Sequence, residues 1–460
     1  MIPGTKRAAA LMALTAALVG CATTSPEAAI RDASGEVERR SGHRIQWSED
    51  GEDAAKVDRL VGALLEERLT ADTAASVALL RNKELQASYE DIGIARADLV
   101  QAGLLKNPSV SGALRFPLDP GAVLGGEISL AQSLLELLTI GPRKDSARAS
   151  LEASVVRVAH LVLVHVAETK SAFYTLQAAE QTYAMRAVVA EAAQTAADLA
   201  KKQNEAGTIN DLSLANEEAL AAQVGLELSR SRADVASARE RLNRLMGLWG
   251  KETDWRSAEK LPELPPEDPT VERLESLAIG QRLDLRAASK DVEAIDWGLT
   301  YAKTSRWIPG LGAGIAFEKA SEGYRLLGPS VTVEVPLFDQ GRAGVARLEA
   351  QLRQAKARES KLAVDIRSEV REGRVRMETQ RRVVQTYRDT LVPLRERIVA
   401  LSQQQYDAML LGVFQLLLAR REEINAYRDY IEALRDYWIA RAELDLRAGG
   451  ALTSSRKATP

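Results

Sequence analysis

Hydrophobic and polar residues follow the period of an α-helix over most of this chain. In the first such stretch, residues 70–105, the apolar side chains fall near one face of a helix. Asn107 and Pro108 end the stretch, because proline cannot continue a helix and disfavours the helical conformation of the residue before it. The pattern predicts one helix that stops before Pro108.

After Pro108 the period changes from helical to alternating. Bulky apolar side chains take the even positions of residues 109–116, and residues 127–132 alternate again. Pro120 and Gly121 lie between the two runs and are typical of a turn. Together these runs predict a β-hairpin.

Two long helical stretches follow, residues 141–206 and residues 211–245, with Gly207 between them. Apolar residues in the second stretch recur at coiled-coil intervals. A helix of about 65 residues is roughly 100 Å long, several times the diameter of a small domain. Its apolar face therefore needs neighbours along its whole length, from this chain or from other copies.

The same order of elements returns after residues 250–270, a linker rich in proline. The pattern of apolar residues after this linker predicts a helix at 271–306, strands near 313–318 and 331–335, a long helix at 341–410 and a last helix to about residue 446. The order indicates two internal repeats, residues 70–249 and 271–447, with Pro108 and Pro309 as the helix-to-strand breaks. Pro393 lies inside the long helix, where it should produce a kink or a local bulge.

The first twenty residues have the pattern of a secretion signal. Lys6 and Arg7 precede an apolar run that is too short to span a membrane as a helix. The run ends at Gly20, and Cys21, the single cysteine of the chain, follows directly. This ending resembles a bacterial lipobox, so we expect residues 1–20 to be a signal peptide and Cys21 to carry the lipid. An ordinary signal peptide followed by a chance cysteine is the alternative.

Residues 21–69 are polar, and we interpret them as a lipidated periplasmic extension of low regularity. Ala22 is not the aspartate that would retain a lipoprotein of this kind, which implies sorting to the outer membrane. Beyond the signal, the sequence has no run of 18 consecutive apolar residues, so any membrane crossing must use strands. Residues 448–460 are expected to be a disordered tail.

Composition excludes several classes of function. Lys and Arg number 61 against 64 Asp and Glu, which gives no basic excess for binding nucleic acid. His160 and His165 lie five positions apart, whereas a helical metal site needs a spacing of three or four. The sequence also has no phosphate loop and no nucleophile motif. We therefore expect no metal site, no cofactor and no enzymatic activity.

The four predicted strands have about the length of tilted membrane strands. Their alternation suits a wall with lipid on one face and water on the other. Open sheet edges cannot face lipid, and a barrel with a water-filled lumen needs more strands than one chain offers. Several chains should therefore share one barrel. The alternative is a soluble four-stranded sheet packed on helices.

The element order and several short motifs resemble those of the TolC-like family of outer-membrane efflux ducts, over about residues 70–447. One departure is Leu283, because the family often has proline after the arginine. The motifs are residues 102–108 (AGLLKNP), 241–247 (RLNRLMG), 281–285 (QRLDL) and 335–339 (VPLFD).

The resemblance implies a mainly α fold with a small β part. In a homotrimer, the four strands of each chain would contribute to a 12-stranded outer-membrane β-barrel, and the long antiparallel coiled-coil helices would form a periplasmic α-barrel. The implied function is the passive outer-membrane channel of a tripartite efflux system in a Gram-negative bacterium. Its partners would be a periplasmic adaptor (membrane fusion) protein and an inner-membrane pump, for example of the resistance-nodulation-division type. The alternative is a lipid-anchored periplasmic coiled-coil structural protein without a channel.

The two turns between long helices are the expected periplasmic tips, which by resemblance close the aperture and contact the adaptor. We align Gly207 with Gly412, and we expect apolar contact residues at exposed positions beside them. The alternative is that both glycines merely end helices. The tip residues are Gly207, Thr208, Ile209 and Asn210 in the first turn, and Gly412, Val413 and Phe414 in the second.

Many members of the family are thought to close with acidic residues just past the second tip. Residues 416–421 hold no carboxylate, so this feature cannot be transferred to the chain. Asp211 follows the first tip, and we interpret it as a helix cap. The second tip, residues 409–414, resembles tips of heavy-metal efflux ducts.

Overall fold

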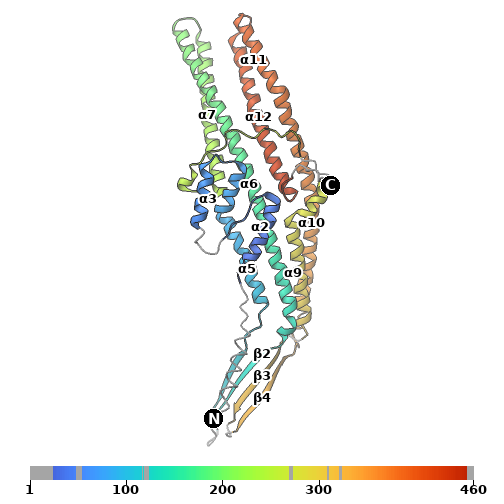
Figure 1. Cartoon of the computed structure of the whole chain (residues 1–460). Coiled ribbons are helices and arrows are strands. Elements are labelled where there is room, and N and C mark those ends of the chain that lie inside the picture. The colour runs from blue at the N-terminus through green and yellow to red at the C-terminus, as the bar shows by residue number, and fades with distance from the viewer. Residues whose placement is uncertain are drawn as a thin grey trace. The chain divides into compact units, whose positions relative to one another are not determined.

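The computed structural model describes residues 24–47, 54–116, 118, 124–268, 273–307, 310–320 and 324–452. These residues are mainly helical and include one four-stranded sheet, which confirms the predicted class (Figure 1). They form two compact units. One unit contains residues 90–155 and 286–360 with the sheet, and the other contains residues 31–89, 156–285 and the chain from 361 onward.

The elements of the second half follow the same order as those of the first half. After α2 (Glu27–Ser41) and α3 (Ala54–Glu66) come α4 (Ala71–Arg81), α5 (Lys83–Ala102), β1 (Ser109–Arg115), β2 (Gly125–Ser133), α6 (Leu135–Glu205) and α7 (Asp211–Met246). The second half has α8 (Leu274–Gln281), α9 (Leu283–Ser305), β3 (Gly310–Lys319), β4 (Arg325–Glu334), α10 (Arg342–Thr386), α11 (Val392–Asp407) and α12 (Val413–Arg447).

The prediction of low regularity for residues 21–69 is wrong, because α2 and α3 lie there. Ala33 and Val37, four positions apart on α2, are fully buried. Val61 of α3 joins a hydrophobic cluster with Leu69 and Phe173. The many charged residues of this segment occupy the outer faces of two short amphipathic helices, so its average polarity hides their apolar stripes.

The helix predicted at 70–105 is two helices, because the backbone of Asn82 is extended. The Asn82 side chain makes this break a cap: Oδ1 accepts hydrogen bonds from the N–H groups of Glu84 (2.9 Å) and Leu85 (3.1 Å). Its Nδ2 donates to the carbonyl of Leu245 near the end of α7 (3.0 Å). The second half breaks in the same way at Arg282, between α8 and α9.

Each break packs against a glycine that follows a later helix. Gly247 follows α7 with φ +71°, and a Cβ there would lie 2.8 Å from the carbonyl oxygen of Arg81. Gly449 follows α12 with φ +90°, and a Cβ there would lie 2.9 Å from the carbonyl carbon of Gln281. Both positions combine left-handed backbone with close approach, so only glycine fits without strain.

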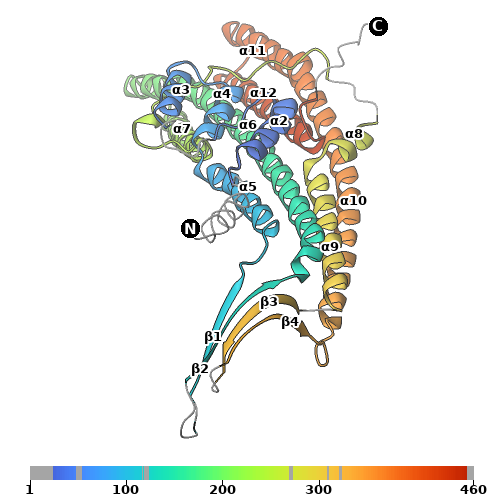
Figure 2. The ribbon, with the colours of Figure 1, turned by 60° about the horizontal axis from the view of Figure 1, so that its bottom comes forward.

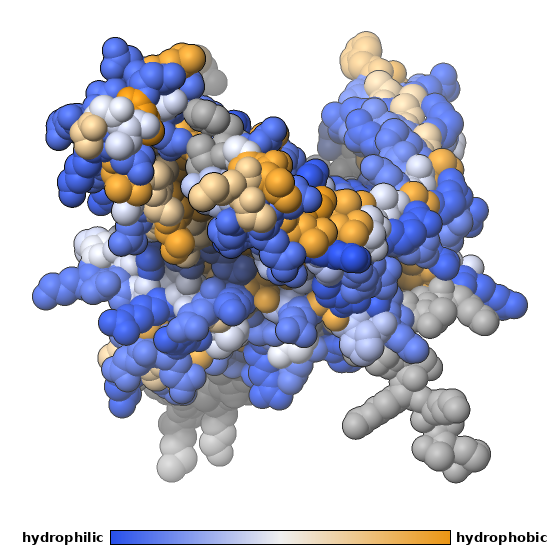
Figure 3. Space-filling view, turned by 90° about the horizontal axis from the view of Figure 1, so that it is seen from above, coloured by the Kyte–Doolittle hydropathy of each residue, from blue (hydrophilic) through white to orange (hydrophobic). Residues whose placement is uncertain are grey.

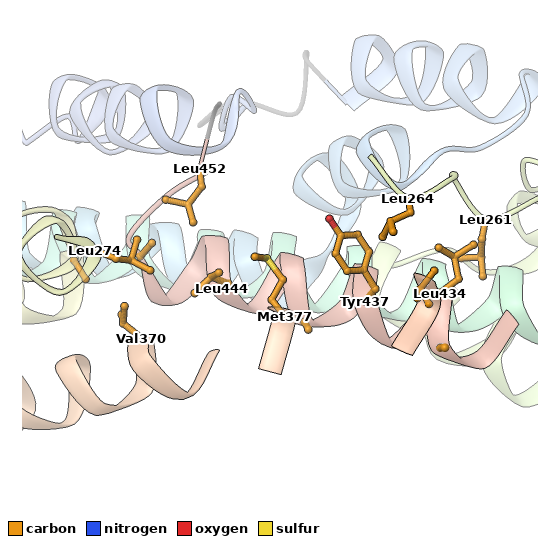
Figure 4. Packing of buried hydrophobic residues seen from close by; sticks show 14 of the residues in the cluster. Leu261, Leu264, Leu274, Val370, Met377, Leu434, Tyr437, Leu444 and Leu452 are labelled. Carbon is orange, nitrogen blue, oxygen red and sulfur yellow. The ribbon is translucent and has the colours of Figure 1, made fainter. Parts of the chain in front are cut away.

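Residues 250–270, interpreted as a linker, contribute to the second unit's hydrophobic core. Arg381 donates to the carbonyls of Pro265 and Pro266, both at 2.6 Å. Trp438 Nε1 donates to the carbonyl of Pro262 at 2.8 Å. The buried cluster drawn in Figure 4 joins this segment to α8, α10 and α12, through Leu261, Leu264, Leu274, Val370, Met377, Leu434, Tyr437 and Leu444.

Helix α6 begins at Leu135, so the predicted start at residues 141–142 is wrong. Pro142 lies inside the helix, where its ring removes one backbone donor without ending the element. One 18-residue window of α6 is apolar enough to cross a membrane by length and composition, but 56% of it is buried within the chain. A buried core helix passes the same test, so composition alone does not make α6 a spanning helix.

The predicted irregularity at Pro393 is confirmed. Residues Tyr387–Leu391 form one turn of π-helix between α10 and α11, and the N–H of Val392 donates to the carbonyl of Tyr387. Proline lacks a backbone N–H, and the wider turn accommodates this gap within a nearly continuous helix.

We predict that Gly247→Ala lowers the free energy of unfolding by more than about 2 kcal/mol, since left-handed backbone alone costs about 1–2 kcal/mol for a residue with a Cβ. Thermal unfolding followed by circular dichroism of the purified protein measures this. Gly225→Ala is the matched control, because a Cβ there meets nothing within 4 Å and its helix should gain up to about 1 kcal/mol. Equal midpoints for the two variants would contradict the assigned role of Gly247.

Candidate functional site

The four described strands form one antiparallel sheet in the order β1-β2-β3-β4, and Figure 2 shows them side by side as a curved sheet. The register brings Val110, Leu130 and Ile315 into one row across β1, β2 and β3. Residues in one row project from the same face of a sheet, and successive residues of a strand alternate between faces. The register therefore assigns every strand residue to one of two faces.

One face, which we call the apolar face, carries all the large hydrophobic side chains of the four strands except Leu326. These side chains are exposed in the single chain: Val110 is 71% exposed, Ile128 is 62% and Val331 is 70%. Contiguous apolar surface of this kind is rare on water-soluble monomers and marks contact with a partner or a membrane. Its other large members are Leu114, Leu130, Ile315, Phe317, Leu327 and Val333.

The opposite face, the polar face, carries small and charged side chains, with Leu326 as its one large apolar residue among the described strands. The hydroxyl groups of Ser111 and Ser129 share a hydrogen bond of 2.7 Å. Arg115 forms ion pairs with Glu127, at 2.9 Å, and with Glu318. These groups suit contact with water, so the sheet can separate an apolar medium from an aqueous one.

Strands β1 and β4 are the two edges of this sheet. Within the residues that the structure describes, the outer backbone groups of both strands lack a partner strand. Such edges are templates for pairing with a further strand, and in an apolar medium they must be paired.

A buried carboxylate fastens the chain where it enters and leaves the hairpin. Pro108 stands directly before β1, and Glu136 lies in the first turn of α6 just after β2. The N–H of Lys106 donates to Glu136 at 2.6 Å, and the Lys106 ammonium lies 3.1 Å from the other carboxylate oxygen. Burial raises the pKa of Glu136, but the hydrogen bonds from Lys106 outweigh it and keep the pKa below its usual value. Pro309, the corresponding break of the second half, lies outside the described residues.

The first tip turns through a glycine in left-handed conformation. Gly207 has φ +73°, its N–H donates to the carbonyl of Asn204 (2.9 Å), and Thr208 N–H donates to that of Gln203 (2.8 Å). Asn210 then caps α7 by accepting from the N–H of Ser213 at 2.8 Å. Asp211 is therefore not the cap, and its carboxylate accepts instead from Asn204 at 3.0 Å.

The second tip has the same backbone, but not at the glycine that the sequence suggested. Met409 takes the left-handed position with φ +57°, and its N–H donates to the carbonyl of Tyr406 at 2.9 Å. Leu410 N–H donates to the carbonyl of Gln405 at 2.9 Å, as Thr208 does at the first tip. Gly412 has φ −77° and stands before α12. The alignment of Gly207 with Gly412 is therefore wrong, because Met409 corresponds to Gly207 and Gly412 to Asn210.

The apolar residues of the tips differ from those expected. Ile209 is half-buried, so its expected exposure is wrong. Val413 and Phe414 lie in the first turn of α12, and their side chains are outside the described part of the structure. Met409 and Leu410 are 94% and 79% exposed. Figure 3 looks at the end that carries the tips and shows hydrophobic patches on a largely hydrophilic surface.

Both helical histidines, His160 and His165, pack against other parts of the folded chain. His165 is buried and donates from Nε2 to the carbonyl of Leu245 at 2.8 Å. Burial lowers the pKa of His160, against the raising effect of nearby Asp284. Among the described residues, no group of three or more His, Cys, Asp or Glu side chains could hold a metal ion.

No protein-family model matches the chain. A curated relative, the Cobalt-zinc-cadmium resistance protein CzcC of Cupriavidus metallidurans, is 23% identical over 372 residues, which cover 77% of this chain and 83% of that protein.

Solved structures share the fold over most of the chain. A membrane protein from Pseudomonas aeruginosa has a TM-score of 0.72 at 20% identity, covering 82% of this chain and 92% of its own. The Campylobacter jejuni CmeC outer membrane channel also has a TM-score of 0.72, at 15% identity, covering 90% of this chain and 91% of its own. The resemblance stated from the sequence is thus confirmed for the fold.

We predict that Glu136→Gln destabilises the protein by roughly 1.5–3 kcal/mol at pH 7, the value typical of hydrogen bonds to a charged group. The pKa of Glu136 is lower in the folded chain, so this stabilisation is present above the unfolded pKa of about 4.3 and is lost as the pH falls through the folded value. Thermal midpoints of the two proteins should therefore converge below about pH 4. Glu349→Gln removes an exposed ion pair with Lys303 and should change stability by less than about 1 kcal/mol. A constant difference between wild type and Glu136→Gln from pH 7 to pH 3 would contradict this account.

Proposed function

Because the chain has the fold of the TolC-like outer-membrane channels, we propose that it is the outer-membrane channel of a tripartite efflux system. In this role it conducts passively what an inner-membrane pump expels. The observation that carries the proposal is the sheet, in which an exposed apolar face lies opposite a polar face, between two open edges. Lipid would cover the first face and water the second.

We propose a homotrimer, because pairing β1 of one copy with β4 of the next would satisfy both edges. Three copies give a closed barrel of about twelve strands, within the range of known outer-membrane barrels. The helices support the same assembly. The apolar stripe of α10 is buried at Val370, Met377 and Val384, and the π-turn shifts it by one residue to buried Val392 and Val399. Beside it, a second apolar row on α11 is exposed at Leu394, Ile398 and Leu401. A coiled-coil seam left open in one chain is complementary to a neighbouring copy, which would extend the barrel as a tube of helices.

The alternative, a lipid-anchored periplasmic coiled coil without a channel, accounts for the helices alone. A tether has no use for four strands with one apolar face, and in water that face would promote aggregation. The sheet therefore favours the channel.

We propose that the mature chain is anchored in the outer membrane of a Gram-negative bacterium by lipid on Cys21 as well as by its strands. Cys21 lies outside the described residues, so this part rests on the lipobox-like sequence that precedes it. The helical unit would then lie in the periplasm.

The two tips are proposed to meet the periplasmic adaptor protein, which connects the channel to the inner-membrane pump. Exposed Met409 and Leu410 would supply most of the apolar contact, and Gly207, Thr208 and Asn210 would contribute from the other tip. Flexible methionine side chains suit protein-binding surfaces. Divalent metal ions are the cargo that we propose, because the curated relative carries the name Cobalt-zinc-cadmium resistance protein.

We predict that the purified protein forms trimers in detergent and conducts ions in planar bilayers, and that Ile315→Lys abolishes insertion. A lysine on the lipid face of a barrel costs about 2–4 kcal/mol per chain near the bilayer midplane. Ala316→Lys is the matched control on the polar face, and it should insert but shift the ion selectivity towards anions. If Ile315→Lys inserts as well as Ala316→Lys, or if wild type stays a water-soluble monomer, the channel proposal fails.

We predict that Leu410→Asp keeps conductance but removes tolerance to zinc, cobalt and cadmium salts in cells that express the protein with its own adaptor and pump. An aspartate at an apolar contact leaves a charge to be desolvated, which costs several kcal/mol. Gln404→Asp, also exposed and near the tip, introduces the same charge at a polar position and should keep tolerance. Retained tolerance in Leu410→Asp would exclude this tip from the contact.

A further inference from the structure

The apolar face of the sheet carries charged residues of one sign only. By register, the carboxylates of the four described strands, Glu127, Glu318 and Glu334, all project from the polar face. The charged residues of these strands on the apolar face are both basic, Lys319 and Arg325. A face that is otherwise hydrophobic thus carries two cations.

These two cations lie directly opposite each other. Lys319 is the last residue of β3 and Arg325 the first of β4, and they form the final pair of that ladder. Both are exposed, and neither forms an ion pair among the residues that the structure describes. Like charges in facing positions destabilise a strand pair, and an anion bound between them would relieve the repulsion.

The neighbours of the pair on the same face are hydrophobic or small. Along the same row, Lys319 faces Gly126 of β2, which in turn faces Leu114 of β1. The row nearer the helices holds Phe317 and Leu327. An anion between the two cations would therefore border hydrophobic side chains, including Leu114, which reaches over Gly126 so that a Cβ there would lie 3.5 Å from its Cδ2.

The position along the strand matches a membrane boundary. From Leu311 to Lys319, β3 extends roughly 26 Å at about 3.3 Å per residue, which at a tilt of about 40° gives roughly 20 Å across the bilayer. Outer-membrane barrels carry an apolar band about 25 Å tall, so the pair would lie near its edge, at the end of the sheet away from the helices. At that depth, lipid phosphates replace acyl chains.

We propose that Lys319 and Arg325 together bind the phosphate group of an anionic lipid at the outer rim of the barrel. Arginine engages phosphate through two N–H groups and lysine adds a point charge, while Phe317 and Leu327 contact the acyl chains. The assignment rests on the proposed membrane role of the sheet. The protein would then prefer anionic lipids, and this preference would depend on the two cations at the outer edge of the apolar band.

The test uses the full-length protein in bilayer nanodiscs of phosphatidylcholine that contain a small fraction of labelled phosphatidic acid. Binding of the labelled lipid is compared between wild type and the double variant Lys319→Gln/Arg325→Gln. We expect each lost cation to weaken binding about fivefold, with a larger loss in the double variant. The control is Arg353→Gln/Lys356→Gln, which removes the same charge from exposed positions on α10 and should bind as wild type does.

Inorganic phosphate as a competitor separates a lipid site from a general anion site. Displacement of phosphatidic acid by millimolar phosphate, or equal binding by wild type and the Lys319→Gln/Arg325→Gln variant, overturns the proposal. Conductance of each protein is recorded in parallel. Wild type that conducts without preferring phosphatidic acid refutes the lipid site and leaves the channel intact, whereas wild type that does not insert refutes the channel.

Discussion

Backbone hydrogen bonding at the edges of one sheet constrains everything else in this protein. Strands β1 and β4 end the described sheet, and its apolar face is exposed along its length. Unpaired N–H and C=O groups cost several kcal/mol each in an apolar medium, so an open sheet cannot remain alone in lipid. In the proposed channel, a closed ring of strands from several copies would satisfy the edges and turn the polar face inward. The long helices would then follow the same symmetry, and their exposed apolar rows would become contacts between copies.

The two halves of the chain share one packing arrangement between a helix break and a glycine. In each half a short helix breaks at a single residue, Asn82 or Arg282, and a glycine after the last helix packs against that break. The chemistry of the breaks differs. The asparagine caps a helix with its own amide, whereas the buried arginine pairs with Asp284 at 2.5 Å. Backbone geometry is thus preserved where side chains are not, because close approach and handedness constrain the main chain more strictly than residue identity.

The two tips also share one backbone geometry although their residues differ. Both turns have one left-handed residue, a glycine at position 207 and a methionine at position 409. A methionine in this conformation costs of order 1–3 kcal/mol, and such strain persists where the surroundings or a function require it. The left-handed conformation of Met409 leaves a flexible apolar side chain exposed at the very end of a helical hairpin. The second tip is therefore better suited to an apolar partner than the first.

The sequence alone determined the element order, the hairpins and the bulge at Pro393, because periodicity and proline act locally along the chain. It did not determine α2 and α3, whose short apolar stripes are masked by charge, or the break at Asn82, whose capping bonds reach α7. The tertiary structure alone decided which residue of the second tip takes the left-handed conformation. The sequence favours Gly412, but the turn formed by the two paired helices puts Met409 at that position. The assignment of Lys319 and Arg325 to the apolar face also required the tertiary structure, because strand register depends on pairing between segments far apart in the sequence.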